Sequence, residues 1–412
     1  MTVRRRLGLI GVAALIGAID TVVLKLFVGV VDKGTTGLWN DVFHTDEHRW
    51  VVVPLALVLG IALAGVLLLV RQPRLPPPHT NSLAFADDDE PATLTGIGMI
   101  LFVGLICLLA GASLGPEAAL VGSTAAFGLW CGQRTGDGPT ARLLQLASVG
   151  ALLVAFVGSF LLVLLPLLML AQKKQLKVET AVPVVIASAS AFGTLWLIDH
   201  GTKAYGSIPA SSHFSVGDVL VAALVGALAA ILGWALHQLI ALLHSVALRL
   251  DSRVAWPVAA ALFGAVIGLS YWAGGQSVEF SGNKGTPLLI EHQPAYALGA
   301  LFVILVAKLL ATSWSLASGY RGGLVFPSVF IGAAIALIAE NVFSLTGPGV
   351  IIGAIAGMFS AMAGPLVAFI FIGSLIPIKL LGIAAVGIVG AMVGTRLCSK
   401  FPVYTPSQIP DA

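Results

Sequence analysis

The sequence predicts an all-α polytopic membrane protein built from two inverted halves of broken and tilted helices. Of the 412 residues, 58% are apolar and only 10% are charged, whereas soluble domains carry roughly 25% charged residues. Long uncharged runs fill the chain, and two Gly- and Pro-containing interruptions lie about half the chain apart, at 111–122 and 318–327. Interrupted hydrophobic segments at matching places in two halves are typical of a transport site between repeats.

The uncharged runs indicate about 10 to 12 hydrophobic elements, because a helix needs about 20 residues to cross a bilayer. In the first half, helices are expected at 7–31, 50–70, 91–112, 116–131 and 182–198, with two segments in the run 143–172, which Ser159 and Pro166 interrupt. The second half is expected to hold helices at 218–248 and 254–274, one that contains Lys308, one from Pro327 to about 339, and two or three more. We expect the repeats to be 1–205 and 206–412, with a loop at 275–287 and no soluble domain.

Charges beside the apolar runs predict the orientation. Arg4, Arg5 and Arg6 precede the first helix, and Arg71 and Arg74 follow the second, which places the N-terminus in the cytoplasm. We expect the protein to lie in the plasma (inner) membrane. The net charge of +3 is small, so nucleic acid is not an expected partner. Three cysteines in or beside apolar segments predict no disulfide framework and no metal site, and nothing in the sequence calls for a cofactor or for enzymatic catalysis.

The first interruption predicts an anion site. Gly115 makes a bend inexpensive, and Pro116 suits the first turn of a helix. A helix that begins inside a bilayer leaves amide N–H groups and the positive end of its dipole without partners, unless it faces protein or a polar cavity. An anion there satisfies them, with Ser113, Leu114 and Gly115 as candidate contacts.

The second interruption carries a family resemblance. The run 322–332, Gly-Gly-Leu-Val-Phe-Pro-Ser-Val-Phe-Ile-Gly, resembles a helix start of the CLC chloride channels and chloride/proton exchangers. Four further stretches are similar to that family, namely Lys308 to Thr312, Ser318-Gly319, Leu114-Gly115-Pro116 and Phe401-Pro402-Val403-Tyr404-Thr405. The resemblance implies a homodimer with one pore per subunit and a chloride-like anion bound around Gly323, Leu324, Val325, Phe326 and the Tyr404 hydroxyl. Backbone N–H groups and a neutral hydroxyl suit transport because they bind an anion without trapping it.

Departures from the family pattern favour a passive channel or uniporter. Leu114 stands where the family has a gating glutamate, and it can neither bind a proton nor mimic an anion. Where exchangers carry an internal proton glutamate, at 169–172, the chain has no carboxylate, and the inner serine motif falls on 72–76, which contains no serine.

Glu117 and Lys308 are the charged candidates near these breaks. Glu117 either only stabilises the helix start through the dipole, or acts as a displaced gate or proton carrier. Lys308 is an intramembrane cation that we expect to face the core and raise the potential for an anion, with a structural pairing as the other interpretation.

Other functions stay open at this point. They are a chloride/proton exchanger that uses Glu117, a fluoride-preferring member and a non-conducting relative. From another class, residues 111–115 also fit the G-x-S-x-G nucleophile elbow of serine hydrolases, which requires a preceding strand and a basic partner for Ser113.

Overall fold

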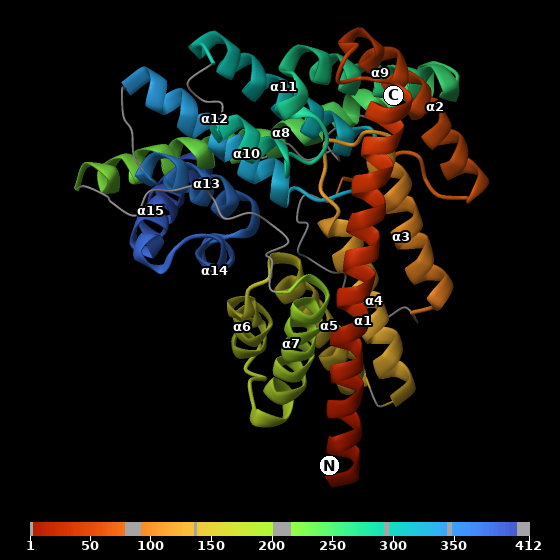
Figure 1. Cartoon of the computed structure of the whole chain (residues 1–412), viewed down its shortest axis with the longest axis vertical. Coiled ribbons are helices and arrows are strands. Elements are labelled where there is room, and N and C mark those ends of the chain that lie inside the picture. The colour runs from red at the N-terminus through yellow and green to blue at the C-terminus, as the bar shows by residue number, and fades with distance from the viewer. Residues whose placement is uncertain are drawn as a thin grey trace. The chain divides into compact units, whose positions relative to one another are not determined.

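The structure is a computed structural model that describes residues 3–78, 92–135, 138–200, 216–291, 296–343 and 348–401. All regular elements in these ranges are helices, which confirms the all-α class (Figure 1). The α-helices before residue 200 are α1 (Val3–Thr35), α2 (Val52–Leu69), α3 (Leu94–Leu109), α4 (Glu117–Thr135), α5 (Gly138–Val157), α6 (Leu164–Gln172) and α7 (Val178–Asp199). After it they are α8 (Val216–Arg253), α9 (Trp256–Gly274), α10 (Gly285–Glu291), α11 (Leu298–Ala317), α12 (Val325–Phe343), α13 (Pro348–Ala363), α14 (Pro365–Leu375) and α15 (Leu381–Cys398).

The helices have the length and composition of membrane spans. Within the described residues, nine helical stretches are long and apolar enough to cross a bilayer. Large apolar side chains lie exposed along them, as at Leu15, Leu26 and Leu220, which suits a surface that faces lipid. The chain is therefore a multi-pass membrane protein.

The described chain forms two compact units, the first of which comprises Met1–Val30, Leu83–Phe102 and Ala118–Ser207. Small residues let its helices approach closely: Gly17 of α1 lies against the carbonyl of Ala187 in α7, and the Ser190 hydroxyl donates to the Ala14 carbonyl at 2.7 Å. Ion pairs join Lys25 to Asp199 and Arg6 to Glu179 along the same pair of helices. Helices α5, α6 and α7 lie side by side in this unit (Figure 1).

The second unit comprises Val31–Ser82, Val103–Glu117 and Ile208–Ala412. It is also held together by glycine contacts: Gly60 of α2 lies against Gly264 of α9, and Gly226 of α8 lies against Gly387 of α15. Helices α12 and α13 are buried along most of their length. The two units are not the sequence halves 1–205 and 206–412, and the division into inverted repeats stays a prediction.

Two details differ from the sequence-based expectation. The run 143–172 does form two segments, but only the break near Ser159 is real: α5 ends at Val157 and Gly158 takes a φ of 71°. Pro166 lies in the first turn of α6, where its missing N–H costs no hydrogen bond. Within the expected loop 275–287, α10 begins at Gly285, a helix that the sequence analysis missed.

Candidate functional site

The two interrupted segments pair with each other in the second unit. The Gly115 N–H donates to the Gly323 carbonyl at 2.9 Å, and the Gly323 N–H donates to the Gly115 carbonyl at 2.8 Å. This isolated antiparallel bridge comes just before Glu117, where α4 begins, and just before Val325, where α12 begins. Two helix N-termini are thus brought together by residues about half the chain apart.

The Glu117 side chain reaches across this junction. Its Oε1 accepts a hydrogen bond from the Val325 N–H at 2.6 Å, and the Phe326 amide also interacts with the carboxylate. Glu117 is only 2% exposed, and its Oε2 is buried without a hydrogen-bond partner among the described residues. A negative group therefore lies at the positive end of α12, as an anion bound to that helix N-terminus does.

Two glycines make room for this carboxylate. A Cβ at Gly323 overlaps the Cγ and the carboxyl group of Glu117, and a Cβ at Gly115 overlaps its carboxyl oxygens. Neither glycine has a positive φ, so space, rather than backbone conformation, requires glycine at both positions.

Leu114 and Ser113 are held by contacts within the protein. Leu114 is fully buried, and its Cβ lies 2.5 Å from where a Cβ at Gly322 would lie. The Ser113 N–H donates to the Ser315 Oγ at 3.0 Å, and its hydroxyl donates to the Phe280 carbonyl at 3.2 Å and lies 3.2 Å from the Thr312 hydroxyl. Ser113 follows the helix α3, not a strand, and these described contacts include no basic group, so the two requirements of a nucleophile elbow are missing from them.

Lys308 binds the loop that precedes α10. It is fully buried, its Nζ donates to the carbonyls of Val278 at 3.0 Å and Phe280 at 2.6 Å, and it lies 5.1 Å from the Phe330 ring centroid. The Phe280 N–H donates to the Tyr271 hydroxyl, which in turn donates to the Gly111 carbonyl, both at 2.9 Å. This network ties the loop to the segment before α4.

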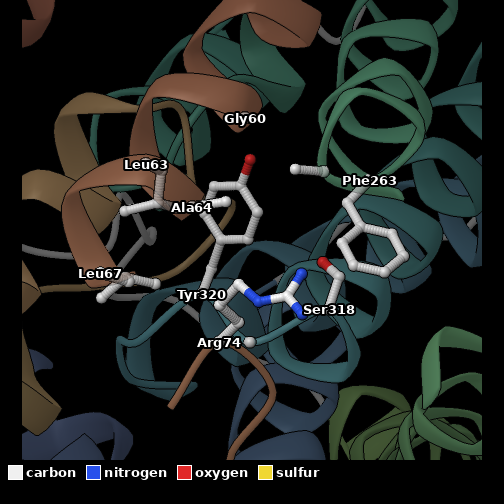
Figure 2. A pocket seen from close by; sticks show the side chains of 10 residues that line it. Gly60, Leu63, Ala64, Leu67, Arg74, Phe263, Ser318 and Tyr320 are labelled. Atoms are coloured by element: carbon white, nitrogen blue, oxygen red, sulfur yellow. The ribbon is translucent and has the colours of Figure 1, made fainter. Parts of the chain in front are cut away.

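A small cavity of about 20 Å³ lies beside Tyr320 in the segment that leads to α12. Figure 2 shows the Tyr320 hydroxyl directed toward Gly60, with the Arg74 guanidinium close to Ser318. The hydroxyl is buried without a hydrogen-bond partner among the described residues. The volume is large enough to hold a single water molecule.

The segment 72–76, on which the inner serine motif of the resemblance falls, packs against the same lead-in. Arg321 donates to the Gln72 side chain and to the Pro73 carbonyl, both at 3.0 Å, and Gly319 lies against the Arg74 carbonyl with a φ of 87°. Asp251 of α8 accepts two hydrogen bonds from Arg74, at 2.6 and 2.9 Å.

The structure thus brings most of the predicted site residues together and adds others. Gly115, Gly323, Val325 and Phe326 meet around the Glu117 carboxylate, while Leu324 is buried beside them. Tyr404 lies outside the described residues. The sequence analysis did not predict the polar contacts of Ser113, which involve Thr312 and Ser315 of α11 and the Phe280 backbone. It also missed Tyr271 of α9, because these partners lie far from Ser113 in the sequence.

A multi-pass helical fold in which two broken helices meet N-terminus to N-terminus defines a class of membrane transport proteins. The model of the voltage gated chloride channel family matches residues 83–396, and the chain belongs to this family.

One protein of known sequence and two solved structures are similar to the chain. The chain is 26% identical over 346 residues to the ion-transport protein YfeO of Escherichia coli O127:H6, which covers 80% of this chain and 78% of that protein. The fold is similar to a slow cyanobacterial Cl⁻/H⁺ antiporter, with a TM-score of 0.79, 16% identity and coverage of 98% of this chain and 97% of that one. It is also similar to a CLC-type fluoride/proton antiporter, with a TM-score of 0.72, 16% identity and coverage of 95% and 96%.

Proposed function

We propose that the protein moves a small anion, chloride first, across the plasma (inner) membrane by a passive route that Glu117 gates. The observation that carries this proposal is the hydrogen bond from the Val325 N–H to the Glu117 carboxylate at 2.6 Å. Membership of the family supports anion transport as the general activity. The hydrogen bond between Val325 and Glu117 supports closure of the route by the Glu117 side chain.

The carboxylate acts as a tethered competitor of the transported ion. Amide N–H groups at a helix N-terminus bind a negative group of either kind, and one such position cannot hold two negative charges at once. The anion therefore enters when the Glu117 side chain leaves, or when a proton removes its charge. Gly115 and Gly323 leave the space that either occupant needs.

A passive route is favoured over exchange by residues that cannot carry protons. Leu114 is fully buried at the position of the usual gating glutamate, and α6 ends with Met169, Leu170, Ala171 and Gln172. A proton can thus open the route at Glu117, while a carboxylate for stoichiometric proton passage is missing from the positions where the family has one.

Exchange is the second candidate, because Glu117 is itself a carboxyl group that can pick up a proton in the ion path. The antiporters with a similar fold act on chloride in one case and fluoride in the other, so fluoride is the second candidate ion. The proposal also includes a homodimer, a cytoplasmic N-terminus, two inverted repeats and a contact between the anion and the Tyr404 hydroxyl.

Efflux from liposomes that hold the purified protein tests the proposal. With valinomycin to release potassium and with external pH recorded, the expected result is chloride efflux without proton movement. Protons driven uphill by a chloride gradient would instead establish exchange. Absence of chloride and fluoride flux would contradict transport and support the non-conducting alternative.

A further inference from the structure

A second buried carboxyl group lies in the first unit, apart from the residues discussed so far. Asp20, in the middle of α1, is 2% exposed. Its Oδ2 lies 2.6 Å from the Ser148 hydroxyl of α5, and the same hydroxyl lies 2.7 Å from the Thr124 carbonyl of α4. Three helices therefore meet at one short polar chain of Asp20, Ser148 and Thr124.

The number of hydrogens in this chain determines the charge of Asp20. The Ser148 hydroxyl has one hydrogen, and the Thr124 carbonyl can only accept. If that hydrogen points to the carbonyl, the 2.6 Å contact to Asp20 requires a hydrogen from the carboxyl group. A single hydrogen shared between two acceptors gives longer and weaker bonds than the two that are found. Both contacts are complete hydrogen bonds only if Asp20 is a carboxylic acid.

The charged groups around Asp20 do not offer a cation to balance a carboxylate. The cations on α1 that pair within this unit, Arg6 and Lys25, are bound to the α7 carboxylates Glu179 and Asp199. From α4, Cys131 is close enough to interact with Asp20 electrostatically, and Arg134 lies 4.0 Å from the ring of Trp130. From α5 the facing group is Ser148. Among the described residues Asp20 forms no ion pair, and an unpaired charge inside a membrane helix is costly.

We propose that Asp20 is a proton-binding site within the first unit. The ligand is a single exchangeable proton on Oδ2, which donates to the Ser148 hydroxyl, which in turn donates to the Thr124 carbonyl. When the proton leaves, rotation of the Ser148 hydroxyl lets it donate to the carboxylate instead. The site is thus able to hold and to release a proton when only the Ser148 hydroxyl rotates. The proposal rests on residues of the first unit and is independent of gating at Glu117.

Infrared difference spectra between the purified parent protein and its variants at neutral pH test this proposal. An exposed Asp has a pKa of about 3.9 and is therefore ionised at that pH. The expected result is a protonated carboxyl C=O band that disappears in Asp20→Asn, whose amide N–H can replace the acid O–H. This band is expected to shift in heavy water because the proton exchanges. The Glu117→Gln and Glu279→Gln spectra identify any bands that belong to these two carboxyl groups, which are also poorly exposed.

Ser148→Ala provides a second variant in case Asp20→Asn does not fold. It removes the acceptor of the acid proton and is expected to move the Asp20 band to the position of a less strongly hydrogen-bonded acid. A spectrum in which Asp20→Asn removes only carboxylate bands would overturn the proposal, as would Ser148→Ala leaving every acid band in place. A band that never shifts in heavy water would refute an exchangeable site.

Discussion

The Glu117 carboxylate accepts a hydrogen bond from the Val325 N–H across 208 residues of sequence. The bond joins the first residue of α4 to the first residue of α12, next to the backbone bridge between Gly115 and Gly323. A helix N-terminus that is buried inside a membrane protein needs a polar partner. In the described structure α12 obtains that partner from Glu117, in the position that we propose for a transported anion.

Gly323→Ala is expected to displace the Glu117 carboxylate. Its Cβ overlaps the Glu117 side chain, so the hydrogen bond to Val325 is lost. Because a hydrogen bond to a charged group contributes about 1.5–3 kcal/mol, we expect the free energy of unfolding to fall by about that amount. In this background a further Glu117→Gln change is expected to have little additional effect on stability, which a double-mutant cycle measures.

The matched control for this variant is Gly299→Ala in α11. A Cβ at Gly299 meets no atom within 4 Å, and Ala is favoured over Gly in a helix by about 0.8–1.0 kcal/mol, so stability is expected to be unchanged or slightly raised. Full additivity of Gly323→Ala and Glu117→Gln would argue against the contact.

Lys308→Met is expected to destabilise the protein. The change leaves the buried carbonyls of Val278 and Phe280 without the donor that now reaches both, at a cost of at least about 2 kcal/mol. Thermal unfolding in detergent measures the loss. A variant with unchanged stability but reduced anion flux would instead support the interpretation that Lys308 acts through its charge on the anion.

Lys284→Met serves as the comparison for Lys308. The Lys284 side chain is 67% exposed and forms an ion pair with Asp32. An exposed pair contributes about 0–1 kcal/mol, so this substitution is expected to change the unfolding temperature far less.

Glu279 is expected to make stability depend on pH. Burial raises the pKa of Glu279 to about 7 from its ordinary 4.5, and the nearby Arg49 opposes the rise. The folded protein therefore binds this proton more tightly than the unfolded chain. The contribution of Glu279 to stability is complete below about 4.5 and is lost as pH rises through about 7.

Unfolding temperatures across this pH window check the prediction. Glu279→Gln should remove the part of the decline that belongs to Glu279, and an unchanged slope would contradict it. Glu291→Gln, on the exposed last residue of α10, is the matched control and should leave the slope as in the parent protein.

Composition and the Gly and Pro residues that interrupt the apolar runs were sufficient to predict the fold class and the two breaks. Long uncharged runs identify helices in a bilayer because only closed backbone hydrogen bonding is tolerated there. Gly115 and Gly323 lie at positions where close approach is required, and a resemblance to a known family could be recognised there. The same approach predicted wrongly that Pro166 interrupts its segment, because a proline in the first turn of a helix removes no helical hydrogen bond.

The partners of the site residues could not be predicted. The bond from Val325 to Glu117, the contact of Lys308 with Val278 and the pairing of Asp20 with Ser148 each join segments far apart in the sequence. Such contacts depend on how the helices pack, and periodicity does not specify packing partners. Glu117 could be named as a candidate from its position at a helix start, but its role depends on α12.

The most direct test of gating is the pH dependence of chloride efflux from liposomes with the parent protein and with Glu117→Gln. If the carboxylate closes the route, parent flux should rise as pH falls, because a proton removes the charge that competes with chloride. Glu117→Gln should conduct at a high, pH-independent rate, and loss of about 1.5 kcal/mol of hydrogen bonding corresponds to roughly a tenfold gain. Glu179→Gln, at an exposed pair with Arg6, should behave like the parent protein. Parent-like flux and an unchanged pH profile in Glu117→Gln would contradict the account and leave Glu117 as a structural partner of α12.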